Sequence, residues 1–207
     1  MKSDTSELMA EVIQHYQNYM AKVRYHKNKC DDPIWKRNNK LGAYGFIPSP
    51  RPIAIIKALR ATLGYLTKKT GDDDFSFLDA GCGAGNILLF AYAVGFTNVA
   101  GIELDEKTVR IARSLITRAV NMGHSCKIIR ANLIEYTKYK SYDVIYYYQP
   151  MHSDNMEVFL NLLKKNMKIG AVVVVNGLDL FRGDKEFKRI LRAPDVRPVD
   201  GIYEKIK

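Results

Sequence analysis

The sequence predicts an α/β fold, in which a doubly wound and mostly parallel sheet of about seven strands follows an N-terminal helical extension. Three observations predict it. A strand, a glycine loop, a helix and a second strand succeed one another within residues 75–105, further strands and helices alternate after them, and a short strand pair closes the chain. A crossover of this length joins parallel strands, so the sheet is expected to be built from βαβ units.

Composition indicates a globular chain with one main domain. Its 207 residues are enough to bury a full core, and 47% hydrophobic with 26% charged residues is ordinary for such a protein. No apolar run reaches the roughly 18 residues of a membrane span, and the first residues lack the apolar core of a signal peptide. Cys30, Cys82 and Cys126 are isolated, so we expect reduced thiols, no metal site and a cytoplasmic protein.

Two parts are expected: a helical and basic extension over residues 1–40 and the main domain over residues 41–207. Residues 1–70 hold 13 Lys and Arg against 5 Asp and Glu, in a chain whose formal net charge is +10. The basic residues within 22–69 favour an anionic partner, such as nucleic acid, an acidic protein segment or a membrane surface. The alternative is that this charge serves solubility alone.

The first elements follow from hydrophobic spacing and from proline. An amphipathic helix is expected over residues 5–24, where apolar side chains recur every three or four positions. A helix over residues 53–67 follows Pro52, which suits a helix start because its missing N–H costs nothing there. A short apolar run at residues 75–79 predicts the first strand, and the almost wholly apolar residues 87–94 predict a buried helix.

The remaining elements alternate in the same way, as strands at 98–104, 127–130, 142–151 and 171–175 and helices at 106–120 and 154–168. A short basic helix is expected over residues 180–191. Asp200-Gly201 is a hairpin turn signal, so two short strands are expected around it within residues 196–207.

The glycine loop is the main functional feature of the sequence. Residues 79–86 read DAGCGAGN, with Gly81, Gly83 and Gly85 at alternate positions. Glycine accepts positive φ angles and lets a ligand lie against bare backbone. Glu103 follows Gly85 by 18 residues, about the spacing at which an acidic residue meets ribose hydroxyls in nucleotide-binding βαβ units. The unit is therefore predicted to hold a ribose-bearing ligand.

The loop differs from a dinucleotide site. A dinucleotide loop reads GxGxxG and holds a pyrophosphate, whereas this loop reads GxGxG and is preceded by Asp79. A carboxylate there would repel a pyrophosphate but suits a cationic amino-acid ligand. With Asp79, the three glycines and Glu103, the sequence resembles the class I (seven-strand, Rossmann-like) S-adenosylmethionine-dependent methyltransferases, whose first motif is D/E-x-G-x-G-x-G. The alternative is an unrelated glycine-rich turn.

The resemblance implies S-adenosyl-L-methionine as cofactor and a role for individual residues. The glycine loop would pack against the methionine part, and Glu103 would bind the ribose. Asn132 stands where the family has an acidic residue that accepts a hydrogen bond from the adenine amino group, and its side-chain carbonyl can still accept that bond. The next backbone N–H would serve the ring nitrogen. The implied cofactor-binding residues are Tyr44, Asp79, Gly81, Cys82, Gly83, Gly85, Asn86, Glu103, Leu104, Asn132, Leu133 and Tyr148.

Two further stretches resemble those of non-SET protein lysine methyltransferases. Their entry loop reads approximately Tyr-x-x-x-Pro-Thr-Pro, and it is matched here by Tyr44, Pro48, Ser49 and Pro50. The similarity implies that this loop covers the methionine end of the cofactor. Residues 146–150 read YYYQP, which is closer to the style of these enzymes than to the D/N/S-P-P-Y/F of nucleobase N-methyltransferases.

The tyrosine strand is the most informative stretch for the substrate. Side chains alternate along a strand, so Tyr146 and Tyr148 are expected to share one face and Tyr147 the other. Tyr148 and Gln149 are the expected catalytic residues, bordering the site of methyl transfer. The alternative is that all three tyrosines are core residues packed under helices.

The sequence thus predicts an S-adenosylmethionine-dependent methyltransferase that acts by orienting a nucleophile. The motif at residues 146–150 favours a protein amine, a lysine, as acceptor. A nucleic-acid methyltransferase is the alternative, which the basic N-terminal third supports. A third hypothesis, a non-catalytic cofactor-binding scaffold, is disfavoured by the intact loop. The oligomeric state is left open.

Overall fold

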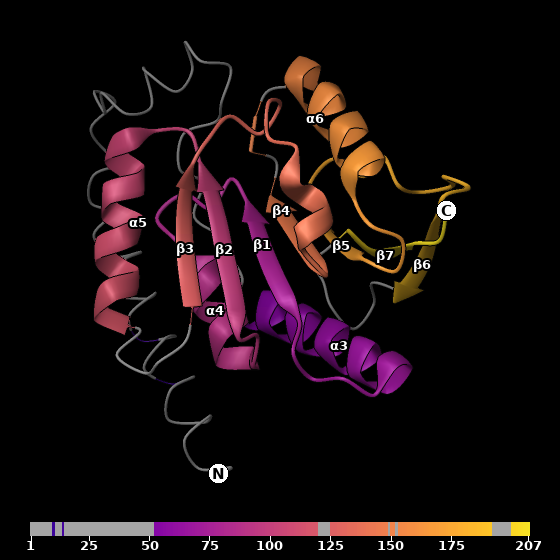
Figure 1. The fold of residues 1–207 in the computed structure, drawn as a ribbon, viewed down its shortest axis with the longest axis horizontal. Helices are drawn as coiled ribbons and strands as arrows, with labels where there is room; N and C mark the ends of the chain where they lie inside the picture. Colours follow the sequence, from indigo (N-terminus) through magenta and orange to yellow (C-terminus); the bar gives the residue numbers. More distant parts are fainter. Residues whose placement is uncertain are drawn as a thin grey trace.

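The computed structural model describes Ala10, Gln14 and residues 52–119, 125–148, 150–151, 153–191 and 200–207 (Figure 1). Ala10 and Gln14 are helical, and the rest of the expected extension lies outside the described residues. So do Tyr44, the Pro48–Pro50 loop and Gln149, whose expected roles therefore stay predictions.

The described residues form a seven-stranded sheet of order β3-β2-β1-β4-β5-β7-β6 (Figure 1). Strands β1 to β5 are parallel, whereas β7 pairs antiparallel with both β5 and β6. The order reverses between β1 and β4, the switch point at which ligands bind in doubly wound sheets. The expected α/β fold with a mostly parallel sheet is confirmed. The strands are β1 Ser76–Ala80, β2 Asn98–Glu103, β3 Ser125–Arg130, β4 Val144–Tyr148, β5 Val172–Asn176, β6 Phe187–Leu191 and β7 Gly201–Lys205.

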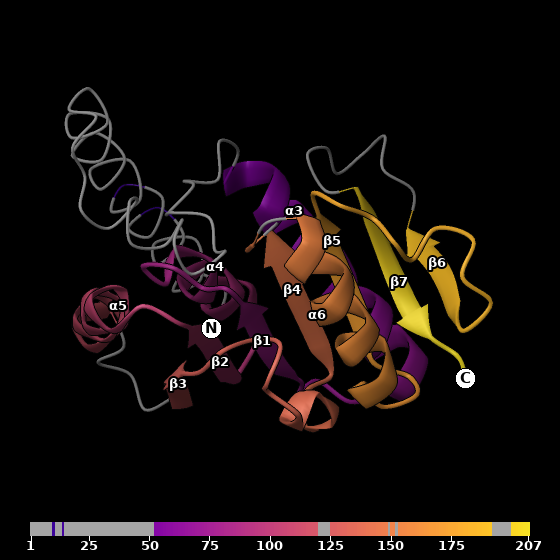
Figure 2. The ribbon, with the colours of Figure 1, turned by 90° about the horizontal axis from the view of Figure 1, so that it is seen from above.

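Helices cover both faces of the sheet. Two apolar clusters form on its two sides: one packs α3, α4 and α5 against the strands, and the other packs α6 and the 3-10 turn η1. Figures 1 and 2 show α4 and α6 on opposite faces. Because both faces are buried, the inner strands are apolar throughout rather than alternating. These elements are α3 Pro52–Thr70, α4 Asn86–Val94, α5 Glu106–Ala119, η1 Lys138–Ser141 and α6 Ser153–Asn166. Among the described helices, none is long and apolar enough to cross a membrane.

The expected alternation of the three tyrosines in β4 is confirmed. Tyr146 belongs to the cluster under α3 and α4, and Tyr148 packs against that same cluster. Tyr147 belongs to the opposite cluster, where its ring lies 5.8 Å from that of Phe159. Tyr146 and Tyr147 are almost fully buried, so these two are core residues. Only Tyr148, at the end of the strand, is partly exposed and able to face a substrate.

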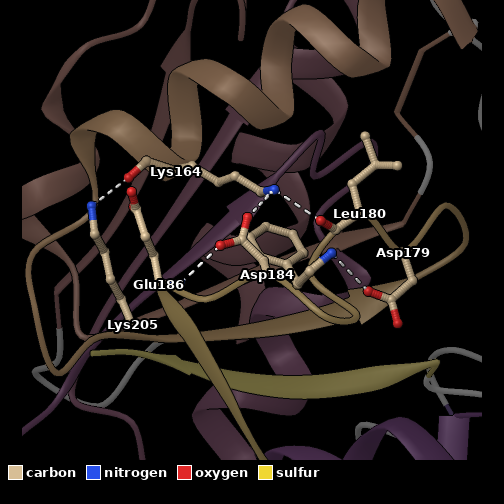
Figure 3. Close-up of polar contacts among 7 residues, drawn as sticks. Lys164, Asp179, Leu180, Asp184, Glu186 and Lys205 are labelled. Atoms are coloured by element: carbon tan, nitrogen blue, oxygen red, sulfur yellow. Dashed lines mark hydrogen bonds and ion pairs between the residues drawn. The ribbon is translucent and has the colours of Figure 1, made fainter. Parts of the chain in front are cut away.

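The prediction of a basic helix over residues 180–191 is wrong. This segment forms turns followed by strand β6. Asp179 and Asp184 accept hydrogen bonds from the backbone N–H groups of Phe181 and Glu186, which turns the chain instead of continuing a helix. Lys164 of α6 fixes the turn by donating to the Leu180 carbonyl at 2.8 Å and to the Asp184 carboxylate at 2.6 Å (Figure 3).

The predicted hairpin around Asp200-Gly201 is also wrong, although the closing antiparallel pair exists. Its first strand is β6, at residues 187–191, and Gly201 opens β7. Gly201 pairs with Val175 of β5, and the Asp200 N–H donates to the Val175 carbonyl at 2.8 Å. The sequence signal therefore marks a strand start. The basic side chains of β6 are those expected of an edge strand, because charge there opposes further strand pairing.

Strand β7 connects the two helical layers. The Glu204 carboxylate accepts hydrogen bonds from Tyr65 and Lys69 of α3. The neighbouring Lys205 is buried and donates to the carbonyl of Lys164 in α6 (Figure 3) and to that of Met167, just after the helix. Successive side chains of a strand point to opposite faces, so these two residues hold opposite helices to one strand.

Candidate active site

The candidate site lies at the carboxyl ends of the parallel strands, where β1 runs into the glycine loop. Gly81, Gly83 and Gly85 all have positive φ, at 92°, 52° and 89°. Their conformation is one that side-chain-bearing residues rarely adopt, which explains the glycines. The N–H groups of Gly81 and Cys82 both donate to the Ile102 carbonyl, at 3.0 and 2.8 Å. The loop is therefore fastened to β2.

Close packing accounts for two glycines. A Cβ on Gly81 would lie 2.5 Å from the Pro150 Cβ, so the chain leaving β4 passes directly over the loop. A Cβ on Gly101 would lie 2.6 Å from the Cys82 sulfur. The Cys82 side chain is thus buried over β2, and burial raises the pKa of its thiol well above the usual range. Cys82 therefore stabilises the loop through the packing of its side chain and the hydrogen bond of its backbone N–H.

Glu103 closes β2 and faces the loop. Its carboxylate accepts hydrogen bonds from the backbone N–H groups of Gly83, at 3.1 Å, and Asp105, at 2.8 Å. Burial raises the pKa of Glu103 to about 7, against the opposing effect of the bond from Gly83. The group therefore changes its charge near neutral pH. The residue after it, Leu104, is half-buried at the same strand end.

Two buried acceptors lack donors beside the loop. Asp79 is 2% exposed and Asn86 is 6% exposed. In the part of the chain that the structure describes, neither Oδ2 of Asp79 nor Oδ1 of Asn86 receives a hydrogen bond. Burial, and next the negative charge of Glu103, raise the pKa of Asp79 well above its usual range. Since buried polar groups in native proteins normally have partners, these atoms suit a ligand that carries donors or positive charge.

The turn after β3 forms another side of the site. The Asn132 carbonyl accepts hydrogen bonds from the N–H groups of Glu135 and Tyr136, at 3.1 and 3.0 Å. Leu133 is buried, and its carbonyl accepts a hydrogen bond of 2.8 Å from the hydroxyl of the fully buried Tyr139. The Asn132 side chain donates to the Glu135 carboxylate at 3.1 Å. Asn132 is therefore held by groups of the turn, and Leu133 by a side chain of η1.

The opposite half of the rim is formed by β4, β5 and β7. Tyr148 pairs with Asn176 of β5, a buried residue that donates to the Tyr146 hydroxyl at 3.1 Å. After it, the Gly177 N–H donates to the Asp200 carboxylate at 2.6 Å. Leu178 is 39% exposed in the loop that follows. The surface beyond Tyr148 thus combines exposed apolar and acidic side chains.

The fold brings most of the expected site residues to one edge of the sheet. Asp79, the glycines, Asn86 and Glu103 meet around a single loop, Asn132 and Leu133 follow β3, and Tyr148 ends β4. Sequence reasoning missed Gly101, Glu135 and Tyr139. A glycine inside a predicted strand is a signal of close packing, which identifies Gly101. The partners of Glu135 and Tyr139 depend on the shape of the turn and have no such local signal.

Comparison with known sequences identifies the family. A family model described as a methyltransferase domain matches residues 71–193, which is more than half of the chain. The curated ribosomal protein L11 methyltransferase of Fusobacterium nucleatum subsp. nucleatum is 26% identical over 139 residues. The matched part covers 65% of this chain and 43% of that protein, so the chain spans less than half the length of this relative.

Solved structures show the same fold. Magnesium protoporphyrin IX methyltransferase from Synechocystis PCC 6803, with S-adenosylmethionine bound, has a TM-score of 0.56 and 16% identity, covering 90% of this chain and 96% of that one. An RNA methyltransferase from Salinibacter ruber, in complex with S-adenosyl-L-homocysteine, has a TM-score of 0.52 and 19% identity, covering 76% and 91%. The chain therefore belongs to the methyltransferase domain family and shares the class I fold of these S-adenosylmethionine-bound and S-adenosylhomocysteine-bound structures.

Proposed function

We propose that this enzyme methylates an amine of a protein substrate, with a lysine side chain as acceptor, and that its cofactor lies across the ends of β1, β2 and β3. The unpartnered buried acceptors beside the glycine loop are the observation that carries the cofactor placement. Two buried oxygens, on Asp79 and Asn86, lack hydrogen-bond donors within the described residues. S-adenosylmethionine fits them, because it presents an ammonium group and a sulfonium centre. When bound, it supplies an electrophilic methyl group.

Each strand end has a distinct part in this placement. Asp79 and Asn86 would hold the ammonium end, since a carboxylate is stabilised there by positive charge. Glu103 would exchange its bond from Gly83 for the hydroxyls of the ribose. Asn132 and Leu133 would face the adenine ring from the turn after β3. The bare backbone at Gly83 leaves room for the ligand between these groups.

Tyr148 is the proposed contact to the acceptor. It is the partly exposed member of the tyrosine strand, and it stands beside the glycine loop because β4 is the neighbour of β1. An amine close to its ring gains about 0.5–2 kcal/mol from cation–π attraction. Holding a nucleophile in line is itself worth several kcal/mol in such reactions. Gln149, next in the chain, remains proposed as a second group at the transfer site.

The rim around Tyr148 carries acidic and apolar groups that suit a cationic substrate, and Arg189 lies beside them, donating to the Asp200 carbonyl. Asp179 and Asp200 hold the loop after β5 through their carboxylates, and Leu178, directly before Asp179 in the chain, is exposed. Acidic and apolar groups suit a lysine with its long alkyl chain. The similarity to a ribosomal protein L11 methyltransferase also supports a protein substrate. The basic residues of the N-terminal third favour the second candidate, a nucleic-acid acceptor.

A labelling experiment separates the two acceptors. Cell extract is incubated with the enzyme and S-adenosylmethionine carrying a labelled methyl group, and portions are then digested with nuclease or with protease. We expect label in macromolecules that survives nuclease and is released by protease, with methyl-lysine after acid hydrolysis. Asp79→Asn should lose most of this label, and Asp73→Asn, at an exposed aspartate outside the site, should keep it. Label released by nuclease alone would contradict a protein acceptor.

A further inference from the structure

The Asn132 side chain differs from a carboxylate in the hydrogen bonds that it can form with the adenine amino group. A carboxylate offers only acceptor oxygens, whereas an amide has one acceptor end and one donor end. If the amide NH₂ group faced the adenine amino group, two hydrogen-bond donors would meet and no hydrogen bond would form. An asparagine therefore serves at this position only if something fixes which end faces the ligand.

Two hydrogen bonds in the turn favour the same orientation of the Asn132 side-chain amide. The Asn132 Nδ2 donates to Glu135 Oε1 at 3.1 Å, and Asn132 Oδ1 accepts from the Ile134 N–H at 3.3 Å. A rotated amide would place oxygen against the Glu135 carboxylate and NH₂ against the Ile134 N–H, which are both repulsive pairs. Glu135 thus occupies the donor end of the amide, and the carbonyl oxygen keeps a second lone pair for a ligand.

The turn itself does not depend on the Glu135 side chain. Its backbone is closed by the Asn132 carbonyl, which accepts from the N–H groups of Glu135 and Tyr136. Tyr139, fully buried, fastens it from below through the Leu133 carbonyl. The Glu135 side chain is exposed. Truncating it therefore removes the contact to Asn132 and leaves the turn in place.

We infer that Glu135 is a positioning residue for cofactor recognition: it orients and polarises the Asn132 amide so that Oδ1 accepts the hydrogen bond from the adenine amino group. The inference rests on the proposed cofactor placement. A carboxylate partner draws the amide N–H and makes the amide oxygen a stronger acceptor. The pair Asn132–Glu135 then replaces the single acidic residue that the family has at position 132.

The test compares two ligands by calorimetry: S-adenosylhomocysteine and S-inosylhomocysteine, in which a carbonyl oxygen replaces the amino group of the base. We expect the wild type to bind the adenine compound more tightly. Glu135→Ala should narrow this preference about three- to tenfold, the range for one hydrogen bond of ordinary net strength, because the Glu135 side chain is exposed to water. Glu135→Gln, which keeps an acceptor, should restore part of it. Glu157→Ala, at an exposed glutamate of α6, should leave it unchanged.

The same Glu135→Ala change in a second variant, Asn132→Asp, should have the opposite effect on ligand affinity, which loss of structure would not produce. In Asn132→Asp, the residue at 132 needs no orienting partner, and Glu135 becomes a like charge beside it. Adding Glu135→Ala there should tighten S-adenosylhomocysteine binding instead of weakening it. Equal losses for both ligands in Glu135→Ala, or weakening in both backgrounds, would overturn the inference.

A substitution at Glu103, outside the turn, distinguishes an error in the inference about Glu135 from an error in the proposed cofactor placement. Glu103→Gln should weaken both ligands alike, because both carry the ribose. If Glu103→Gln weakens both while Glu135→Ala changes nothing, the inference alone is wrong. If neither change affects binding, the cofactor placement is wrong and the inference falls with it.

Discussion

Glu103 illustrates how one buried carboxylate can couple the cofactor site to pH. The backbone of the glycine loop donates to it, but burial dominates and raises its pKa to about 7. The ionised form accepts hydrogen bonds from ribose hydroxyls through all its lone pairs, whereas protonation converts one oxygen into a donor. Below its pKa, ligand binding has to compete with the bound proton.

Cofactor affinity is therefore expected to rise with pH. With a pKa near 7, the dissociation constant of S-adenosylhomocysteine should be about tenfold larger at pH 6 than at pH 8. Calorimetry at both values measures this directly. Glu103→Gln should bind weakly and lose most of the pH dependence. A wild-type affinity that is the same at both pH values would contradict the coupling of Glu103 protonation to ligand binding.

Gly81 lies at the junction between β1 and α4, where a side chain is expected to destabilise the fold. Two conditions apply to it: a φ of 92° and a Pro150 side chain 2.5 Å from any added Cβ. Gly71 has a positive φ and open space, and Gly64, inside α3, has open space and no unusual φ. The three glycines thus separate backbone strain from crowding.

Alanine at these three positions should change the free energy of unfolding in a graded way. Gly64→Ala should stabilise by about 0.5–1 kcal/mol through helix propensity. Gly71→Ala should cost about 1–2 kcal/mol from its left-handed conformation. Gly81→Ala should cost about 3 kcal/mol or more, because the clash with Pro150 adds to the strain. Urea denaturation measures all three, and a Gly81→Ala cost no larger than that of Gly71→Ala would contradict the contact.

At the level of elements, the sequence predicted what depends on local pattern. The apolar runs of the inner strands and Pro52 at the start of α3 appear as expected. The helix predicted over residues 180–191 is wrong, because the turn-forming aspartates and the hydrogen bond from Lys164 outweigh the helical spacing of the sequence. The site divides in the same way. Asp79 and Glu103 follow from a motif, while the Gly81–Pro150 contact and the Asn132–Glu135 pair arise only when the chain is folded.

Across the whole molecule, the sheet is divided into two halves, which under the proposed function would hold the cofactor and the acceptor. The strands β1, β2 and β3 present the loop, Glu103 and the turn at Asn132, whereas β4, β5 and β7 present Tyr148, Asn176 and the acidic rim. The division coincides with the reversal of strand order between β1 and β4. Methyl transfer would then occur along the line between the halves, where Pro150 crosses Gly81.

The proposed cofactor placement can be checked in a crystal structure of the chain with S-adenosylhomocysteine bound. The predicted result is the homocysteine end beside Asp79 and the glycine loop, the ribose hydroxyls on Glu103, and the adenine amino group on Asn132. A ligand bound elsewhere, with no contact to Gly83 or Glu103, would contradict the account.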